Sequence, residues 1–203
     1  IYFHHLNSSQ AMCFNFFYPL ISAHQLDYVT DYLGHKEEID YSSVCFEKES
    51  DIDSQGGRRP TNFDFYFKTK LGKQFFFEIK YTEQDFGKAP KDKNDPKQFA
   101  AEYIDKYNAV YKDRLNSIKP EYRSTDAFLN NYQIMRNLIH ADKNAYVVFL
   151  YPGGNEKIKK GAIHAKSTFA ADHVAANVYC AEWEDMYDFV APKLNSPKLL
   201  NQY

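Results

Sequence analysis

The chain has 203 residues, which is enough for one domain with a sizeable core and too short for two comfortable domains. Its hydrophobic content of 44% and charged content of 26% are typical of a globular protein, although Phe and Tyr, at 17 each, are unusually frequent. The net charge of −2 is not the electrostatic footprint of a general nucleic-acid binder. It does not exclude a nuclease, because Lys and Arg can gather locally around an acidic metal site.

Cysteine usage and hydropathy bear on the cellular compartment. Cys13, Cys45 and Cys180 are widely spaced in apolar contexts, which predicts reduced, buried thiols in a reducing compartment. The sequence has no run of about 18 apolar residues and no basic-then-apolar signal segment. We therefore expect a cytoplasmic protein without membrane contact. The start at Ile1, without Met, is consistent with a preceding N-terminal segment.

The N-terminal part predicts two helices, a strand and a loop. An apolar stripe predicts a helix that is capped at Ser8 or Ser9 and broken or kinked at Pro19, followed by a shorter helix over residues 22–33. Beyond these helices we expect a strand over residues 44–47 and a polar, Gly-rich loop over residues 50–61.

The next segment predicts a β-hairpin with two different faces. Aromatic-rich runs over residues 62–67 and 75–80 flank the turn Lys70-Leu71-Gly72. With Gly72 at positive φ, the pairing is centred near Leu71 and Asp64 falls roughly opposite Glu78. Alternation then gives one apolar face, expected to be buried, and one mixed face. The apolar set is Phe63, Phe65, Phe67, Phe75, Phe77 and Ile79, and the mixed set is Asn62, Asp64, Tyr66, Phe76, Glu78 and Lys80.

The mixed face predicts a metal site suited to phosphodiester hydrolysis. Like charges opposite each other destabilise a sheet, so the Asp64 and Glu78 carboxylates, with Cβ atoms about 5 Å apart, are expected to require a compensating positive charge. Mg²⁺ or Mn²⁺ can supply this charge, because these cations favour hard oxygen ligands. Lys80 projects to the same side, where it could hold a water or stabilise developing phosphate charge. The simpler alternative is a solvated face on which Lys80 only neutralises Glu78.

The rest of the chain predicts helices around one further strand. Residues 83–97, rich in Lys, Asp and Pro, are expected to form a mobile surface loop, and apolar spacing predicts helices over residues 98–117 and 125–140. The continuous apolar run 146–151 predicts a buried strand. One or two more helices and a short strand near residues 178–180 should follow. The pattern alone predicts an α/β or α+β fold, with a mixed sheet flanked by helices.

The hairpin residues resemble a known nuclease motif. Asp64 on one strand and Glu78-Ile79-Lys80 on the next resemble the PD-(D/E)XK nuclease superfamily, although Phe63 stands where the superfamily usually has Pro. Four phrases in order also resemble a bacterial group of restriction endonucleases, and they span roughly residues 5–155. They are Leu6-Asn7-Ser8-Ser9-Gln10-Ala11, Arg59-Pro60-Thr61-Asn62-Phe63-Asp64, Glu78-Ile79-Lys80-Tyr81-Thr82-Glu83 and Tyr132-Gln133-Ile134-Met135-Arg136-Asn137.

This resemblance implies a restriction-endonuclease-like αβββαβ core and a DNA endonuclease. We expect a single domain over residues 1–203, with the core over about 5–155 and a C-terminal elaboration over 156–203. The implied activity is Mg²⁺- or Mn²⁺-dependent hydrolysis of DNA phosphodiester bonds, as in type II restriction enzymes. Two alternatives remain open: a non-catalytic nucleic-acid-binding or interaction module on the same fold, and a nuclease for RNA or for branched or damaged DNA. A homodimer is compatible with double-strand cleavage.

The resemblance also assigns roles to individual residues. Asp64 and Glu78 are expected to bind the metal, with the Ile79 carbonyl as a further ligand, and Lys80 to orient the attacking water. Glu47, at the end of the first predicted strand, is a candidate third carboxylate, and an exposed strand-end acid is the alternative.

Further polar residues are candidates of lower specificity. Gln133 is implied beside the site, and Gln10 on the first helix is either a site residue or a packing residue. Arg136 shares a helix face with Gln133 and could bind phosphate, although a solvated surface cation is the simpler explanation. The candidate nucleic-acid contacts are Arg58, Arg59, Arg136 and Lys88.

Overall fold

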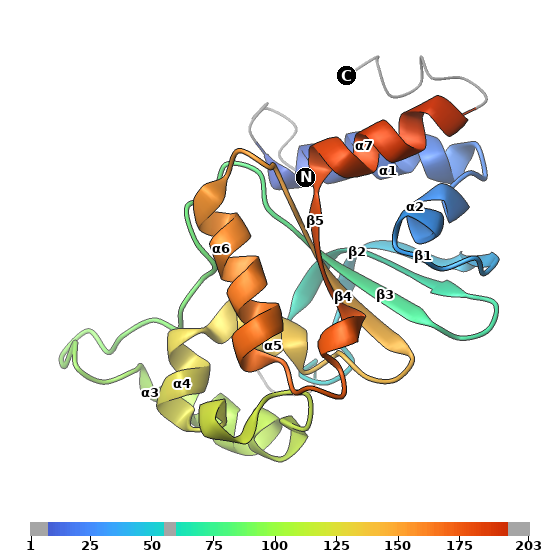
Figure 1. The fold of residues 1–203 in the computed structure, drawn as a ribbon. Helices are drawn as coiled ribbons and strands as arrows, with labels where there is room; N and C mark the ends of the chain where they lie inside the picture. Colours follow the sequence, from blue (N-terminus) through green and yellow to red (C-terminus); the bar gives the residue numbers. More distant parts are fainter. Residues whose placement is uncertain (1–7, 55–59, 195–203) are drawn as a thin grey trace.

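A five-stranded mixed sheet forms the centre of the computed structural model, which describes residues 8–54 and 60–194 (Figure 1). The strands lie in the order β1-β2-β3-β4-β5. β2 is antiparallel to both β1 and β3, whereas β4 is parallel to both β3 and β5. The strand bounds are Ile39–Glu49 (β1), Asn62–Thr69 (β2), Gln74–Ile79 (β3), Ala145–Tyr151 (β4) and Val178–Glu182 (β5).

Helices cover both faces of this sheet (Figure 1). One face carries α1 (Ser9–Ser22), α2 (Asp27–Tyr32) and α7 (Trp183–Val190), and the other carries α3 (Ala101–Lys106), α4 (Thr125–Asn130), α5 (Tyr132–Leu138) and α6 (Glu156–His164). The π-helical turns Tyr107–Tyr111 and Ala165–Phe169 extend α3 and α6, and short 3-10 turns lie at Lys112–Arg114, Pro120–Tyr122, Ala175–Asn177 and Ala191–Lys193. The predicted αβββαβ order is confirmed.

Strand β4 separates the two halves of the core. Successive side chains of a strand point to opposite faces, so a strand buried on both faces is apolar throughout. All residues of β4 are buried, as predicted for residues 146–151. Val147, Phe149 and Tyr151 pack with α3 to α6, and Tyr146, Val148 and Leu150 pack with α1, α2 and α7.

The hairpin forms in the predicted register. Gly72 has φ +84° in the loop, and Phe65 pairs with Phe77, which centres the hairpin on Leu71. Phe17 of α1 stacks on Phe65 with ring centroids 4.0 Å apart. The predicted apolar face is therefore core at Phe65, Phe67, Phe75, Phe77 and Ile79.

The prediction that Phe63 shares this apolar face is wrong. Its buried ring packs on the opposite side, with centroids 4.8 Å from those of both Phe76 and His140. The ladder between β2 and β3 stops short of Asp64, whose carboxylate accepts the Ile79 N–H where a regular ladder would use a main-chain carbonyl. β2 departs from the regular hairpin at Asp64, and Phe63 turns to the other face.

The N-terminal elements differ from the prediction in length. α1 continues through Pro19 to Ser22 as one helix, and β1 begins ahead of the predicted strand 44–47. Ser8 caps α1 as expected, because its side chain accepts the Ala11 N–H at 3.4 Å. All three cysteines are free, but only Cys13 is buried.

The segment between β3 and α3 is anchored to the core. It forms no helix or strand, in agreement with the predicted loop over residues 83–97. Phe86 and Ala89 are nevertheless buried, and the Ala89 N–H donates to the Leu129 carbonyl at 2.9 Å. These contacts hold the start of the segment against α4 and α5.

The C-terminal elements complete the layers of the fold. β5 extends the sheet beside β4, in agreement with the strand expected near residues 178–180. α7 packs on α1, with the rings of Trp183 and Phe16 5.2 Å apart. Within the described ranges, no helix is long and apolar enough to cross a membrane.

Candidate active site

Glu78 and Lys80 lie at the C-terminal end of β3 and face α5. Side chains two residues apart on a strand point the same way, so this pair lies opposite the apolar face of the hairpin. Both residues are buried, 5% and 7% exposed, and Lys80 Nζ lies 3.2 Å from Glu78 Oε1. Burial removes water from both charges, and the attraction between Glu78 and Lys80 offsets part of this desolvation cost.

α5 supplies further partners for Glu78. Gln133 Nε2 donates to Glu78 Oε1 at 2.7 Å, and Asn137 Nδ2 donates to Oε2 at 2.9 Å. The two amides are four residues apart and so lie on one face of the helix. Both oxygens of Glu78 accept a hydrogen bond, which fixes the orientation of this carboxylate.

Gln133 holds Lys80 as well. Its Oε1 accepts from Lys80 Nζ at 3.1 Å and from the Gly87 N–H at 2.9 Å. Lys80 Nζ also lies 5.5 Å from the centroid of the Phe86 ring. One amide therefore connects β3, α5 and the segment that follows β3, and the ammonium has a fixed position beside Glu78.

Asp64 approaches the same strand end from β2. Its Oδ2 accepts the Ile79 N–H at 2.6 Å. Burial raises the pKa of Asp64 well above its ordinary value, and the Glu78 and Glu47 carboxylates raise it further, against the opposing effects of the Ile79 N–H and Lys80. The fold thus brings Asp64, Glu78 and Lys80 into one charge cluster.

Glu47 adds a third carboxylate from β1. Gln10 Nε2 of α1 donates to its Oε1 at 2.9 Å, and Asn62 Nδ2 of β2 donates to its Oε2 at 2.5 Å. Glu47 is exposed and has φ +54°, a left-handed conformation that costs a non-glycine residue roughly 1–3 kcal/mol. Backbone strain of this kind clusters at functional sites.

The oxygen atoms at this strand end suit a hard divalent cation. Asp64 and Glu78 bring two carboxylates to the end of β3, where Asp64 accepts the Ile79 N–H. Carboxylate and carbonyl oxygens are ligands of Mg²⁺ and Mn²⁺. Among residues 8–54 and 60–194, no group of three or more His, Cys, Asp and Glu side chains is placed to hold a metal ion. A metal here would use two carboxylates and the carbonyl. The raised pKa of Asp64 fits such a cation, because positive charge would relieve the repulsion between the carboxylates.

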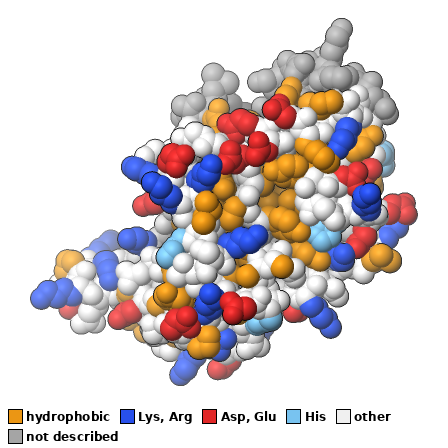
Figure 2. All heavy atoms as spheres, in the orientation of Figure 1, with side chains coloured by type: hydrophobic (Ala, Val, Ile, Leu, Met, Phe, Trp, Pro, Cys, Tyr) orange, Lys and Arg blue, Asp and Glu red, His pale blue; other side chains and the backbone are white. Residues whose placement is uncertain are grey.

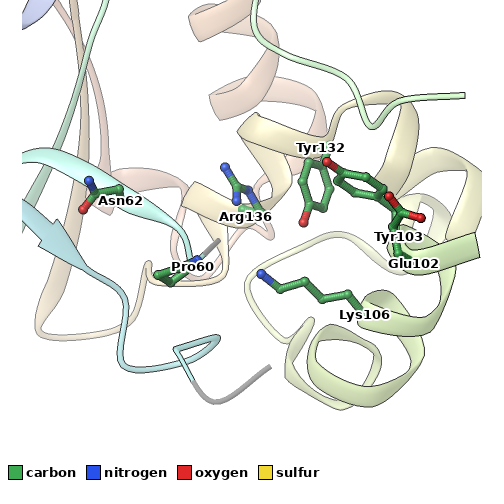
Figure 3. A pocket seen from close by; sticks show the side chains of 7 residues that line it. All are labelled: Pro60, Asn62, Glu102, Tyr103, Lys106, Tyr132 and Arg136. Atoms are coloured by element: carbon green, nitrogen blue, oxygen red, sulfur yellow. The ribbon is translucent and has the colours of Figure 1, made fainter. Parts of the chain in front are cut away.

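A cavity of about 680 Å³ lies between α3, α5 and the start of β2. Figure 3 shows side chains of α3 and α5 facing one another across it, with the start of β2 on a third side. Asn62 in its wall donates to Glu47, and Arg136 in its wall lies on α5 between Gln133 and Asn137. The lining residues are Pro60, Asn62, Glu102, Tyr103, Lys106, Tyr132 and Arg136.

Two of the four candidate nucleic-acid contacts, Arg136 and Lys88, are among the described residues, whereas Arg58 and Arg59 lie outside them. Arg136 lines the cavity. Lys88 is exposed directly after Gly87, which bonds to the site amide. Figure 2 shows further basic side chains, which are all Lys in this sequence, along the segment between β3 and α3.

Two site residues were absent from the sequence prediction. Asn137 lies four residues after Gln133 in the predicted helix 125–140, and this spacing could have identified it. Gly87 contributes a main-chain N–H, which no side-chain pattern reveals. Asn62 was placed on the mixed hairpin face, but its bond to Glu47 depends on the pairing of β1 with β2.

Comparison with known proteins gives a match at the level of the family. The model of the family described as Restriction Endonuclease associating with ARP matches residues 1–203. No curated protein and no solved structure matches the chain. Because the family match covers the whole chain, this protein belongs to the family Restriction Endonuclease associating with ARP.

Proposed function

We propose that the protein is a metal-dependent endonuclease of the PD-(D/E)XK type that hydrolyses phosphodiester bonds of DNA. The observation that carries this proposal is the cluster at the end of β3, where Asp64 adds a second carboxylate to the Glu78–Lys80 pair. A structural ion pair would need only Glu78 and Lys80. A further carboxylate whose charge is disfavoured is typical of functional sites. The family description, which names a restriction endonuclease, supports DNA as the substrate.

The carboxylates and the strand end have binding roles in this proposal. Asp64, Glu78 and the Ile79 carbonyl would hold one divalent cation at the C-terminal end of β3. A bound Mg²⁺ or Mn²⁺ supplies Lewis acidity toward a phosphoryl oxygen and toward water. Glu47 increases the negative charge that favours a cation at Asp64.

Lys80 is the catalytic cationic side chain in this proposal. Its ammonium lies beside Glu78 and is held by Gln133, so it can orient a water and stabilise charge that develops on the phosphate. Gln133 acts through Lys80 and Glu78 and is a positioning residue. Preorganised donors of this kind do not need to reorganise when the charge develops.

Cleavage of supercoiled plasmid DNA tests this assignment. Wild type should nick or linearise the plasmid in Mg²⁺ or Mn²⁺. Excess EDTA should abolish cleavage because it removes the cation, and Ca²⁺ should not support cleavage because it tolerates a looser coordination geometry. Lys80→Ala should lower the rate about 10²–10³-fold. The variant should still fold, with lower stability, because Glu78 loses its buried cationic partner but keeps the bonds from Gln133 and Asn137. Asp64→Asn should lower both cation binding, followed by calorimetry, and cleavage.

Matched controls come from an exposed 3-10 turn away from the cavity lining. Lys112→Ala and Asp113→Asn remove the same charges at exposed positions and should cut at the wild-type rate. Undiminished cleavage in EDTA, or a wild-type rate in Lys80→Ala, would overturn the proposal. A wild type that cuts neither plasmid, single-stranded DNA nor RNA would favour the non-catalytic binding module.

A further inference from the structure

The cavity between α3, α5 and the start of β2 has the dimensions of a small-molecule site. Its volume of about 680 Å³ lies within the range of roughly 300–1,000 Å³ that is usual for ligand pockets. A single nucleotide belongs to the class of ligands that such pockets hold. Its wall combines two Tyr rings with two cationic side chains and the carboxylate of Glu102, as Figure 3 shows.

Arg136 is the cation of this wall that is available to a ligand. Its guanidinium lies over the Tyr132 ring, 4.6 Å from the centroid, and its Nε is shielded from solvent without a hydrogen-bond partner. Among the described residues Arg136 forms no ion pair, whereas Lys106 is 3.0 Å from Asp53. A planar guanidinium suits the phosphate of a nucleotide.

Two aromatic rings stand beside Arg136. Tyr103 and Tyr132 meet edge to face, with centroids 5.3 Å apart and an interplanar angle of 80°. Tyr132 is largely buried, whereas Tyr103 is partly exposed at the cavity. Stacking on an aromatic ring holds nucleobases regardless of their sequence.

Helix α5 places this wall next to the charge cluster. Tyr132 and Arg136 are four residues apart and lie on one helix face, and Gln133 and Asn137, which bond to Glu78, lie on the adjacent face. The cavity wall and the partners of Glu78 therefore share helix α5.

We propose that this cavity binds one unpaired nucleotide of the DNA strand that enters the cluster, with its base beside Tyr103 and its phosphate at Arg136. The inference rests on the proposed function for the nature of the ligand, and it adds the substrate class: DNA with an unpaired stretch. A base in a duplex would first have to unstack, which costs a few kcal/mol, whereas a single strand offers its bases directly. The protein should therefore prefer single-stranded DNA to the matching duplex.

Fluorescence anisotropy tests this inference without cleavage. The probes are a labelled oligothymidylate and the same strand annealed to its complement, both in EDTA at one fixed salt concentration. Arg136→Gln and Tyr103→Leu should each weaken single-strand binding about tenfold, the scale of one lost stacked base, and reduce the preference over duplex. The exposed-site controls Arg114→Gln and Tyr18→Leu should bind like wild type. Thermal unfolding of each variant checks that the fold is retained.

The outcomes separate this inference from the proposed function. Equal losses for single strand and duplex, or cavity variants that bind like their controls, would overturn the nucleotide site even if the enzyme cleaves DNA. Selective loss of single-strand binding would support the site even if Lys80→Ala shows no cleavage defect, because the assay involves no metal and no hydrolysis.

Discussion

At the residue scale, the carboxylate of Asp64 is bound to the main chain of Ile79 and lies close to the charge of Glu78. Its folded-state pKa is raised, first by burial and then by Glu78. A raised carboxyl pKa contributes stability below the unfolded-state value of 3.8, and that stability is lost as the pH rises through the folded-state pKa. At neutral pH an ionised Asp64 therefore destabilises the fold unless a cation compensates it.

Asp64→Asn should consequently stabilise the metal-free protein at neutral pH. The amide keeps an acceptor for Ile79 N–H and removes the charge, and cross-strand charge pairs contribute roughly 0.2–1 kcal/mol. Mn²⁺ should raise the melting temperature of wild type by mass action and leave that of Asp64→Asn nearly unchanged. Calorimetric scans with and without Mn²⁺ measure both effects, with Asp113→Asn as the control. A destabilised Asp64→Asn, or equal Mn²⁺ shifts in both proteins, would contradict the cation site.

His140 gives a second pH-dependent prediction at this scale. Burial lowers the pKa of His140 to about 4, and the neutral ring accepts from Ser50 Oγ at 2.7 Å and donates to the Arg136 carbonyl at 2.9 Å. A lowered His pKa gives stability that is complete above about 6.5 and lost as the pH falls toward 4. This loss amounts to roughly 3 kcal/mol. Urea unfolding at a series of pH values should show this loss in wild type and in the control His173→Gln, an exposed position, but not in His140→Gln. The same pH dependence of stability in all three proteins would contradict the prediction.

At the element scale, the hairpin carries both the apolar core and the charged site. Phe65 is fully buried, stacks on Phe17 at 4.0 Å and lies 5.1 Å from the Phe46 ring. Phe65→Ala should lower the free energy of unfolding by about 3–5 kcal/mol, because it removes a core aromatic and leaves a cavity. Tyr18→Ala, at a position 52% exposed on α1, should cost less than about 1 kcal/mol. Chemical denaturation of the two variants compares these costs, and a change below about 1 kcal/mol for Phe65→Ala would mean that α1 does not depend on this packing.

The hairpin also shows which features local sequence could predict. The register and the buried apolar face follow from side-chain alternation and the Gly72 turn, and both are confirmed at Phe65, Phe67, Phe75, Phe77 and Ile79. The face of Phe63 was mispredicted, because it depends on how Asp64 ends the ladder and on contact with His140, far along the chain. The sequence pattern likewise nominated Asp64, Glu78 and Lys80 through their spacing, whereas the amide of Gln133 acquires its partners only when α5 packs on the sheet.

At the scale of the whole molecule, the site and the cavity are assembled by elements that are distant in sequence. The charged residues of the site come from β1, β2 and β3, and α1 and α5 supply amides that bond to them. The cavity adds α3. The buried ion pair of Asp53 and Lys106, at 3.0 Å, joins the turn after β1 to α3. Asp53 also accepts from Tyr111 at 2.5 Å and from the Thr61 N–H at 2.9 Å. This network connects the sheet to the helical layer behind the cavity.

Asp53→Asn should therefore destabilise the whole molecule and not only the cavity wall. Burial alone would raise the pKa of Asp53, but the bonds from Tyr111, Thr61 and Lys106 hold it at about 2, so its stabilising effect is present above about 3.8 and lost as the pH falls toward 2. The lowered pKa corresponds to roughly 2 kcal/mol of stability. Because Asp53→Asn also leaves Lys106 without this carboxylate, we expect the free energy of unfolding at neutral pH to fall by about 3–5 kcal/mol in total.

Asp51→Asn provides the matched control, because it removes the same charge two residues earlier in the chain. Asp51 is exposed and pairs with Lys48 at 3.1 Å, so its loss should lower the free energy of unfolding by less than about 1 kcal/mol. Urea unfolding at pH 7 should separate the two variants, and the gap between wild type and Asp53→Asn should narrow as the pH falls from about 4 to 2. Equal stabilities of Asp53→Asn and Asp51→Asn at pH 7 would show that the fold tolerates a break between its sheet and α3, and that the cavity wall is not fixed by this ion pair.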